Sequence, residues 1–295
     1  MESDRESVPK PLSGGLYVVA TPIGNLEDMT FRAVRILQQA EAIAAEDTRH
    51  TGKLLHHFQI ETPQLSYHDH NRRSRLPELM ALLQRGKAIA LVSDAGMPGI
   101  SDPGYELVKA CVEEGIPVIP IPGASAVVTA LSASGLPSDR FVFEGFLPAK
   151  SKDRRDRLEQ LKSEQRTLVF YEAPHRIRQT LQDLEQEFGG DRAIVLAREL
   201  TKLHEEFWRG TVSEAIAHYQ QREPQGEYTL VLEGDTQVPL VFSEAMLKAE
   251  LQSLVNQGLS RSQASRQLAQ QTHLPRRDLY QLALSLPDEE NASTP

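Results

Sequence analysis

The sequence predicts an α/β protein with two α/β lobes, followed by a small all-α unit. From Leu16 onward, strand-like apolar runs alternate with helix-like runs, as a parallel α/β sheet requires. In the second half, strand-like runs follow one another without a helix between them, and after Pro239 the pattern is helical only. We therefore expect an N-terminal lobe over residues 13–121, a second lobe over 122–236 and a helical unit over 243–286.

The composition agrees with this division. The chain has 295 residues, which is comfortable for two lobes, and its 40% hydrophobic and 25% charged residues are typical of a soluble globular protein. No apolar run approaches the roughly 20 residues that a membrane span needs. The net charge of −9 argues against a protein that coats nucleic acid indiscriminately, but it leaves local basic patches open.

Both ends of the chain and its single cysteine indicate where the protein is located and which kinds of stabilising site it lacks. Residues 1–12 contain acidic side chains and no apolar signal core, so we expect a disordered lead and a cytoplasmic protein. Residues 287–295 are expected to form a disordered tail. Cys111 is the only cysteine, so the chain cannot form an internal disulfide or a cysteine-cluster metal site. We expect no metal.

The first half reads as a run of strand and helix pairs. Short apolar runs such as AIALV are typical of buried parallel strands, whereas the spacing in YELVKACVEE is helical. The prolines in IPVIPI place that strand near a sheet edge or at a bulge. The expected strands are 16–20, 42–45, 64–67, 88–92 and 116–121, and the expected helices are 30–40, 50–58, 71–84, 105–114 and 127–134.

The second half keeps the same content in another order. Expected strands are 140–144, 167–171, 193–198, 206–209 and 228–233, with helices at about 152–163, 175–187 and 213–221. Consecutive strands indicate a mixed or antiparallel sheet. In the helical unit, Ser260 is a candidate cap, and a turn at residues 273–275 leads to a helix that starts with two arginines. This spacing fits a helix-turn-helix and, equally well, a plain three-helix packing unit.

The most informative segment is SDAGMPGISDPG, residues 93–104. It connects the strand at 88–92 to the helix at 105–114, so it lies at a strand's carboxyl end, where ligands bind in open α/β sheets. Its glycines let backbone groups approach a ligand closely. Asp94 is interpreted as a partner of a positively charged or ribose-bearing cofactor, and Asp102 as structural.

Other strand ends carry polar residues whose roles remain open. TPIGN, at 21–25, could seat a polar cofactor or simply connect a strand to a helix, and it lacks the G-x-G-x-x-G pattern of dinucleotide sites. EDTRH, at 46–50, could be functional or could cap a helix through Asp47 or Thr48. YEAPHR, at 171–176, and ARELTK, at 197–202, end neighbouring strands and suggest one shared crevice. The basic stretch 150–166 is either a solvated helix face or a track for a phosphate backbone.

These segments together resemble the tetrapyrrole methylase superfamily of S-adenosylmethionine (SAM) methyltransferases and, within it, the ribosomal RNA small subunit methyltransferase I family. The likeness runs from about Leu16 to Gly234 through VATPIGNLEDMT, AAEDTRHT, LVSDAGMPGISDPG, PGASA, FYEAPHRI and ARELTKLHEEFWRG. The helices from Ser243 resemble that family's C-terminal helix-turn-helix. Members that methylate porphyrinoids carry Gly-Asp-Pro where this chain has Ser93-Asp94-Ala95, which favours a substrate other than a tetrapyrrole.

The resemblance implies a SAM cleft between the two lobes and 2′-O-methylation of a cytidine in the decoding region of 16S ribosomal RNA. It further implies a homodimer whose partner is that RNA, within the small ribosomal subunit, and no membrane. The superfamily's cofactor contacts carry over to Pro22, Gly24, Ser93, Asp94, Ile100, Ser101, Ser125, Ala126, Glu172, Ala173 and Thr201.

A ribose hydroxyl is a poor nucleophile, so the expected reaction calls for a general base beside the cofactor. The candidates, in falling order, are Glu172, Glu199, His175 and Glu46. The residues expected to bind the substrate's phosphates or ribose are Arg49, Arg198, Lys202, Arg154, Arg155, Arg276 and Arg277. Two other hypotheses are a small-molecule, tetrapyrrole-like methyltransferase of the same fold and a non-enzymatic helix-turn-helix protein that uses the α/β body as a ligand sensor.

Overall fold

The computed structural model describes residues 11–236, 243–272 and 274–286. It contains two compact units, one up to Asp235 and the other from Thr236 onward. The first unit holds two five-stranded sheets, and the second holds three helices. Except for residues 11 and 12, the lead and tail expected at 1–12 and 287–295 lie outside the described residues.

The first sheet is parallel throughout, with the strand order β3-β2-β4-β1-β5. Its strands are β1 (Gly15–Val19), β2 (Ala42–Ala45), β3 (Gln64–Ser66), β4 (Ala88–Val92) and β5 (Val118–Ile121). β5 lies at an edge, as its proline predicts, since proline cannot donate to a sheet ladder. β1 and β4 are neighbours, so the loops after them meet, and a bridge between Thr21 and Gly96 joins those loops.

Helices cover both faces of this sheet, as in doubly wound α/β folds. They are α1 (Phe31–Gln39), α2 (Thr48–His57), α3 (Arg72–Gln84) and α4 (Tyr105–Glu113). Tyr17 and Val19 of β1 pack with buried residues of α1 and α2, and Leu16 and Val18 pack with those of α3 and α4. The alternation of side chains along one strand therefore builds two separate cores.

The second sheet is mixed, in the order β6-β7-β10-β8-β9, and only β6 and β7 run parallel. Its strands are β6 (Phe141–Phe146), β7 (Thr167–Glu172), β8 (Ala193–Arg198), β9 (Glu206–Thr211) and β10 (Tyr228–Leu232). One face packs on α6 (Ser151–Leu161), α7 (Ile177–Phe188) and α8 (Val212–Gln221). The other face packs on α5 (Ala126–Ser134) and on Ile23, which comes from the loop after β1.

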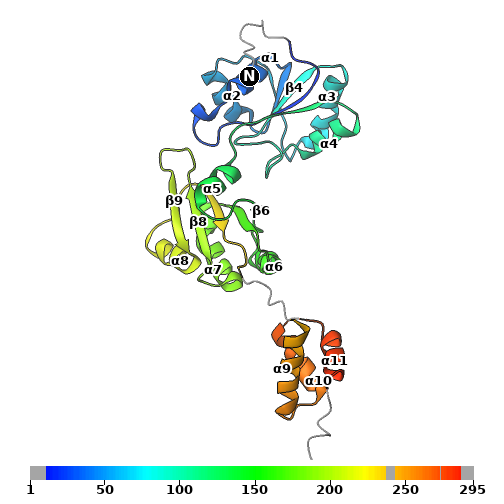
Figure 1. Ribbon diagram of the computed structural model, residues 1–295. Helices are drawn as coiled ribbons and strands as arrows, with labels where there is room; N and C mark the ends of the chain where they lie inside the picture. Colours follow the sequence, from blue (N-terminus) through cyan, green and yellow to red (C-terminus); the bar gives the residue numbers. More distant parts are fainter. Residues whose placement is uncertain (1–10, 237–242, 273, 287–295) are drawn as a thin grey trace, which may run out of the picture. The chain divides into compact units, whose positions relative to one another are not determined.

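The C-terminal unit consists of α9 (Glu244–Asn256), α10 (Arg261–Thr272) and α11 (Arg276–Leu284), side by side in orange and red in Figure 1. Its core draws only on residues from Leu247 onward. Ser260 caps α10, because its hydroxyl accepts from the Gln263 amide at 3.3 Å and the Gln263 side chain accepts in return from the Ser260 amide at 2.9 Å.

The element order agrees with the sequence prediction, and the differences are local. α2 begins at Thr48 rather than His50, because the Asp47 side chain accepts from the Arg49 amide and starts the helix earlier. β5 begins at Val118 rather than residue 116. Two short 3₁₀ turns, Leu26–Asp28 and Pro174–Arg176, stand where the sequence predicted a loop and the start of a helix.

Candidate functional site

A cavity of about 380 Å³ lies at the carboxyl ends of the strands, lined by residues from both lobes. The first lobe contributes the loop after β1, through Ile23, and the loop after β4, through residues 95–97 and 100–102. The second lobe contributes the start of α5, the ends of β6 and β7, and the loops after β7 and β8. A volume of this size is typical of small-molecule and cofactor sites.

Six of the residues expected to contact a cofactor line this cavity: Ile100, Ser101, Ser125, Ala126, Glu172 and Ala173. Pro22, Gly24, Ser93, Asp94 and Thr201 are not on the cavity wall. Their chain neighbours Ile23, Ala95, Leu200 and Lys202 are. The sequence therefore located the loops, and the fold decided which side chains in them face inward.

Asp94 links two loops of the first lobe. Its Oδ1 accepts from the Asp47 amide at 3.1 Å, and its own amide donates to Glu46 Oε2 at 3.3 Å. These bonds tie the loop after β4 to the loop after β2. The aspartate of this segment that lines the cavity is instead Asp102, which the sequence interpretation treated as structural.

Asp102 has an unusual proton affinity for a carboxyl group. Burial raises its pKa to about 6, and the nearby negative charges of Glu46 and Asp94 act in the same direction, while a hydrogen bond from Ser93 opposes them. Burial also raises the pKa of Glu46, against the lowering effect of the Asp94 amide. Three carboxyl groups, those of Asp102, Glu46 and Asp94, therefore influence one another on this side of the site, and of these only Asp102 lines the cavity.

The loop after β1 requires a glycine at position 24. A Cβ at this position would collide with Lys202 Cγ and would lie 2.9 Å from Thr201 Oγ1. The two strand-end loops thus touch across the lobes. Thr201 has a φ of 66°, and its buried hydroxyl has no hydrogen-bond partner among the residues that the structure describes. A buried hydroxyl in this state is a candidate to bind a ligand.

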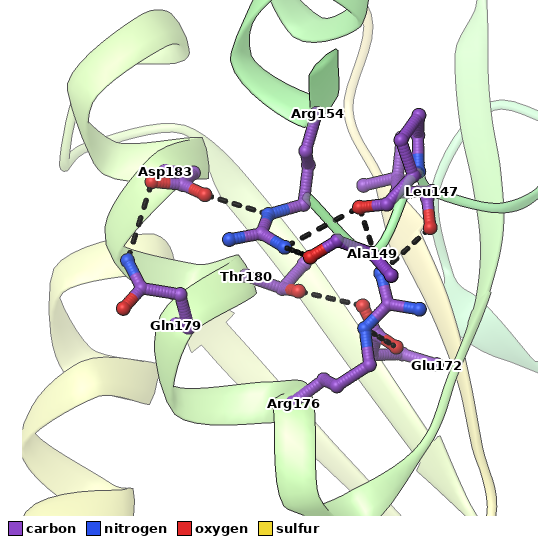
Figure 2. A network of polar contacts seen from close by, with 9 residues as sticks. Leu147, Ala149, Arg154, Glu172, Arg176, Gln179, Thr180 and Asp183 are labelled. Atoms are coloured by element: carbon purple, nitrogen blue, oxygen red, sulfur yellow. Dashed lines mark hydrogen bonds and ion pairs between the residues drawn. The ribbon is translucent and has the colours of Figure 1, made fainter. Parts of the chain in front are cut away.

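Glu172 lies in a buried polar network that Figure 2 shows from close by. Its Oε1 accepts from the Ala173 amide at 2.9 Å and pairs with Arg176 Nε at 3.2 Å, and its Oε2 accepts from the Thr180 hydroxyl at 2.6 Å. Glu172 is only 1% exposed. With both oxygens engaged, this carboxylate is suited to positioning Ala173 in the cavity wall.

Glu199 and Lys202 form an ion pair at the other strand end. Lys202 Nζ lies 2.9 Å from both Glu199 Oε1 and Glu227 Oε2, and the Glu227 amide donates to Glu199 at 3.0 Å. Burial alone would raise the pKa of Glu199, but these hydrogen bonds and the Lys202 charge outweigh it and hold that pKa below its usual value. Glu199 is thus ionised and paired, and only Lys202 and Glu227 reach the cavity wall.

The remaining expected site residues do not line the cavity. His175 is exposed, and Glu46 is partly buried behind Asp94. The Arg49 side chain is 89% exposed and pairs with Asp47 at 2.7 Å. Arg198 is held by Glu206 and by the carbonyl of Gln225, so it links the end of β8 to β9 and to the loop before β10.

Arg154 is a correction to the sequence interpretation, which assigned it to substrate. Its side chain is 3% exposed, and its Nε donates to Asp183 Oδ2 at 2.6 Å (Figure 2). Its Nη1 donates to the carbonyls of Pro148 and Ala149. Arg154 lies on the buried side of α6 together with Leu158 and Leu161, so it is not available to bind a phosphate. Its neighbour Arg155 is exposed.

In the C-terminal unit, Arg276 and Arg277 are exposed on the first turn of α11. Arg276 donates to the Ser262 hydroxyl at 3.1 Å, which connects α11 to α10.

Within residues 11–236, 243–272 and 274–286, no group of three or more His, Cys, Asp or Glu residues could hold a metal ion. In the same ranges, no helix is long and apolar enough to cross a membrane.

Two family models match the chain. Residues 15–216 match the family described as Tetrapyrrole (Corrin/Porphyrin) Methylases. Residues 244–287 match the RsmI C-terminal HTH domain. The first match runs from β1 into α8 and ends before β10, and the second covers the helical unit.

Curated proteins named Ribosomal RNA small subunit methyltransferase I are similar over most of their length. The protein from Synechocystis sp. is 62% identical over 274 residues, which are 92% of this chain and 98% of that protein. The protein from Halalkalibacterium halodurans is 50% identical, over 91% of this chain and 94% of its own. The protein from Bacillus subtilis is 47% identical, over 90% and 93%.

Solved structures share the fold at lower identity. A uroporphyrin-III C-methyltransferase from Thermus thermophilus has a TM-score of 0.54 and 23% identity, and covers 75% of this chain and 94% of its own. The methyltransferase CobJ has a TM-score of 0.57 and 18% identity, over 75% and 95%. A Thermus thermophilus enzyme solved with S-adenosyl homocysteine has a TM-score of 0.52 and 19% identity, over 75% and 97%.

Proposed function

Because the chain belongs to the ribosomal RNA small subunit methyltransferase I family of tetrapyrrole methylases, we propose that it methylates the 2′-oxygen of a cytidine ribose in the decoding region of 16S ribosomal RNA. That it is a SAM-dependent rRNA methyltransferase follows from the family. The observation that carries the proposal is the cavity at the strand ends, lined by both lobes, in a chain that also carries the helix-turn-helix unit. The non-enzymatic hypothesis is thereby set aside.

The cavity fits SAM in size and in chemistry. Ile23, Met97, Ile100 and Leu200 provide apolar surface for a flat adenine ring, and small residues beside them leave the backbone accessible. The Asp102 carboxylate provides a negative charge toward a cationic cofactor.

When bound, the cofactor supplies an electrophilic methyl group on a sulfonium leaving group. We propose that the residues of this chain contribute orientation and a dry environment. The buried Glu172 fixes Ala173 in the wall through the backbone amide, and Thr180 and Arg176 fix Glu172 in turn. Lys202 lies on the wall with its charge paired to Glu199 and Glu227, and its remaining N–H is placed to donate to the ribose of the substrate.

Proton removal requires an acceptor within hydrogen-bond reach of the attacking hydroxyl. Of the four residues expected as a general base, only Glu172 lines the cavity. Its two oxygens already accept from Ala173 and Thr180 and pair with Arg176, so we propose that Glu172 positions the wall. Glu199, ionised in its pair with Lys202, has a similar positioning role toward that lysine.

We further propose that exposed arginines outside the cavity bind the RNA backbone. The members of the expected substrate-binding set whose side chains are exposed are Arg49, Arg155, Arg276 and Arg277.

Family membership also supports a homodimer in the cytoplasm that acts on RNA within the small ribosomal subunit. Sedimentation at several protein concentrations measures whether the protein is a homodimer. Comparison of naked 16S rRNA with whole subunits as substrates measures whether the enzyme needs the assembled subunit.

The proposed function predicts a specific change in ribosomal RNA. In a strain that lacks this gene, mass spectrometry of 16S rRNA fragments should show the loss of one 2′-O-methyl group on a cytidine of the decoding region. Complementation with the intact chain should restore it. An unchanged methylation pattern refutes the proposal. Methyl transfer by the purified protein to a free porphyrinoid would instead support the small-molecule alternative.

A second prediction concerns the C-terminal unit. The four cores of the first unit contain no residue beyond Leu232, so deletion of residues 243–295 should leave that unit folded. We expect the deletion to weaken binding of the small subunit by on the order of tenfold or more, because a second linked contact is lost, while SAM affinity stays unchanged. Calorimetry with SAM and filter binding with subunits measure the two affinities.

The matched variant keeps the unit and removes only two of its positive charges. Changing Arg276 and Arg277 to alanine should reduce the slope of log affinity against log salt by about 1.4, since each contact of a basic side chain with single-stranded phosphate contributes about 0.7. Equal affinity for the subunit with and without the unit would rule out a recruiting role.

A further inference from the structure

Phe146 combines a place on the cavity wall with high exposure. Its ring is 55% exposed, although it belongs to β6 and lines the cavity. Its inner side leans on Tyr171, with ring centroids 5.5 Å apart and the planes inclined by 57°. Tyr171 in turn packs edge-on against Phe143 at 4.9 Å. One face of a supported aromatic ring is therefore open.

A β-bulge in β6 sets the direction of the Phe146 side chain. The register between β6 and β7 shifts between Phe143 and Gly145, and such bulges redirect the side chain that follows. Gly145 has a φ of 65°, and a Cβ there would lie 2.9 Å from Ser101 Oγ in the loop after β4. This position thus requires glycine for its backbone angle and for the approach of the other lobe. Phe146 is presented where both lobes meet the cavity.

Two arginines, the buried Arg154 and the partly buried Arg176, fix the chain directly after Phe146. Arg176 Nη2 donates to the carbonyls of Leu147 and Pro148 at 2.6 and 3.2 Å, and Arg154 Nη1 donates to those of Pro148 and Ala149 at 3.3 and 3.2 Å (Figure 2). Their partners Glu172 and Asp183 hold these arginines in place. An exposed phenyl ring on a segment held this firmly is preorganised to contact a flat ligand, because little side-chain or loop entropy remains to be lost.

Unpaired positive charges follow within nine residues of Phe146. Lys150, Lys152 and Arg155 are exposed at the start of α6, and in the described part of the chain their side chains form no ion pair. An aromatic ring followed by basic side chains is the combination that binds single-stranded nucleic acid: the ring stacks on a base and the charges track the phosphates. SAM has no phosphate to occupy these charges, so they favour the RNA strand.

We propose that Phe146, supported by Tyr171, is the surface on which the base of the target nucleotide stacks, and that Lys150, Lys152 and Arg155 hold the phosphates beside it. This inference rests on the proposed function. It adds a substrate-positioning residue that explains how a nucleotide pulled out of the RNA fold is held with its ribose toward the cavity. Stacking on a phenyl ring is sequence-tolerant, so the ring supplies orientation and affinity for any base.

The test compares three variants with small subunits from the deletion strain and labelled SAM as the actual substrates. Phe146→Ala should lower kcat/KM for the subunit by about 5- to 150-fold, the range that the loss of one base–aromatic stack gives. The Kd for SAM, measured by calorimetry, should stay unchanged. Phe146→Tyr keeps an aromatic face and should restore most of the activity. Phe31→Ala is the matched control, because Phe31 is 98% exposed and is absent from the cavity wall.

The outcomes distinguish which ligand, if any, stacks on the Phe146 ring. If Phe146→Ala matches the Phe31→Ala control in kcat/KM, the stacking role is wrong. If it weakens SAM binding in the same ratio as kcat/KM, the ring holds the adenine of the cofactor and the proposal is overturned. Fluorescence of Trp208, the only tryptophan, confirms that each variant is folded. A wild-type protein that transfers no methyl group to the subunit contradicts the proposed function itself, before any variant is compared.

Discussion

Arg154→Met is expected to lower the free energy of unfolding of the second lobe by about 3–5 kcal/mol, the usual effect of removing one partner from a buried ion pair. Arg154 and Asp183 are 3% and 5% exposed in their side chains, with Nε and Oδ2 2.6 Å apart. Without the guanidinium, the Asp183 carboxylate keeps one side-chain partner in the described structure, the Gln179 amide at 3.4 Å. Two carbonyls, of Pro148 and Ala149, lose a donor as well.

Urea unfolding followed by the fluorescence of Trp208 measures this effect in the relevant lobe, because Trp208 packs against the same core as α6 and α7. Arg155→Met is the control: it changes the same chemistry one residue along, on the exposed side of α6, and should alter stability by no more than about 0.5 kcal/mol. The double variant Arg154→Met, Asp183→Leu should recover much of the loss, since no unpaired charge then stays buried. Equal losses for Arg154→Met and Arg155→Met would show that the pair is not what stabilises this region.

Asp102→Asn is expected to raise the Kd for SAM by about 10- to 150-fold at pH 8, the range for losing an interaction with a charged group in a partly buried site. Asp102 lines the cavity, and burial, aided by the charges of Glu46, Asp94 and Asp69, raises its pKa to about 6. A cationic cofactor favours the ionised carboxylate. Affinity should therefore be full above pH 7 and should fall as the pH drops through 6, approaching tenfold per pH unit.

Calorimetry from pH 5 to 8 measures this dependence, and two variants control it. Asp102→Asn should remove the pH dependence, because asparagine does not titrate. Glu46→Gln takes away one negative neighbour and should shift the midpoint to lower pH without abolishing binding, since a like charge no longer disfavours ionisation. A wild-type affinity that is flat across this range, or an Asp102→Asn variant that binds normally, would contradict the assignment.

Much of the fold could be predicted because local patterns carry it. Runs such as AIALV at 88–92 are short, apolar and β-branched, and they became β4 with the predicted bounds. The proline of β5 predicted an edge or a bulge, and β5 lies at an edge. Consecutive strands predicted a mixed or antiparallel second sheet, and that sheet is mixed. These properties depend on backbone constraints and hydrophobic periodicity, which are written in consecutive residues. The family resemblance, carried by the same strand-end loops, led to the correct enzyme class.

The tertiary structure decided which side chains in those loops face the cavity. These side chains belong to loops beyond the strand ends, where the regular alternation of a strand no longer holds, so the path of each loop decides which side chain meets the cavity. Asp94 joins two loops while Asp102 lines the cavity, and Lys202 lines the cavity while its neighbour Thr201, with a φ of 66°, packs beside Gly24. Arg154, in a basic stretch that reads as solvated, lies in the interior because Asp183 of α7 meets it there. The sequence by itself determined the elements and their order and singled out loops that line the cavity, and only the packing of residues distant in the chain decided which side chains of those loops face it.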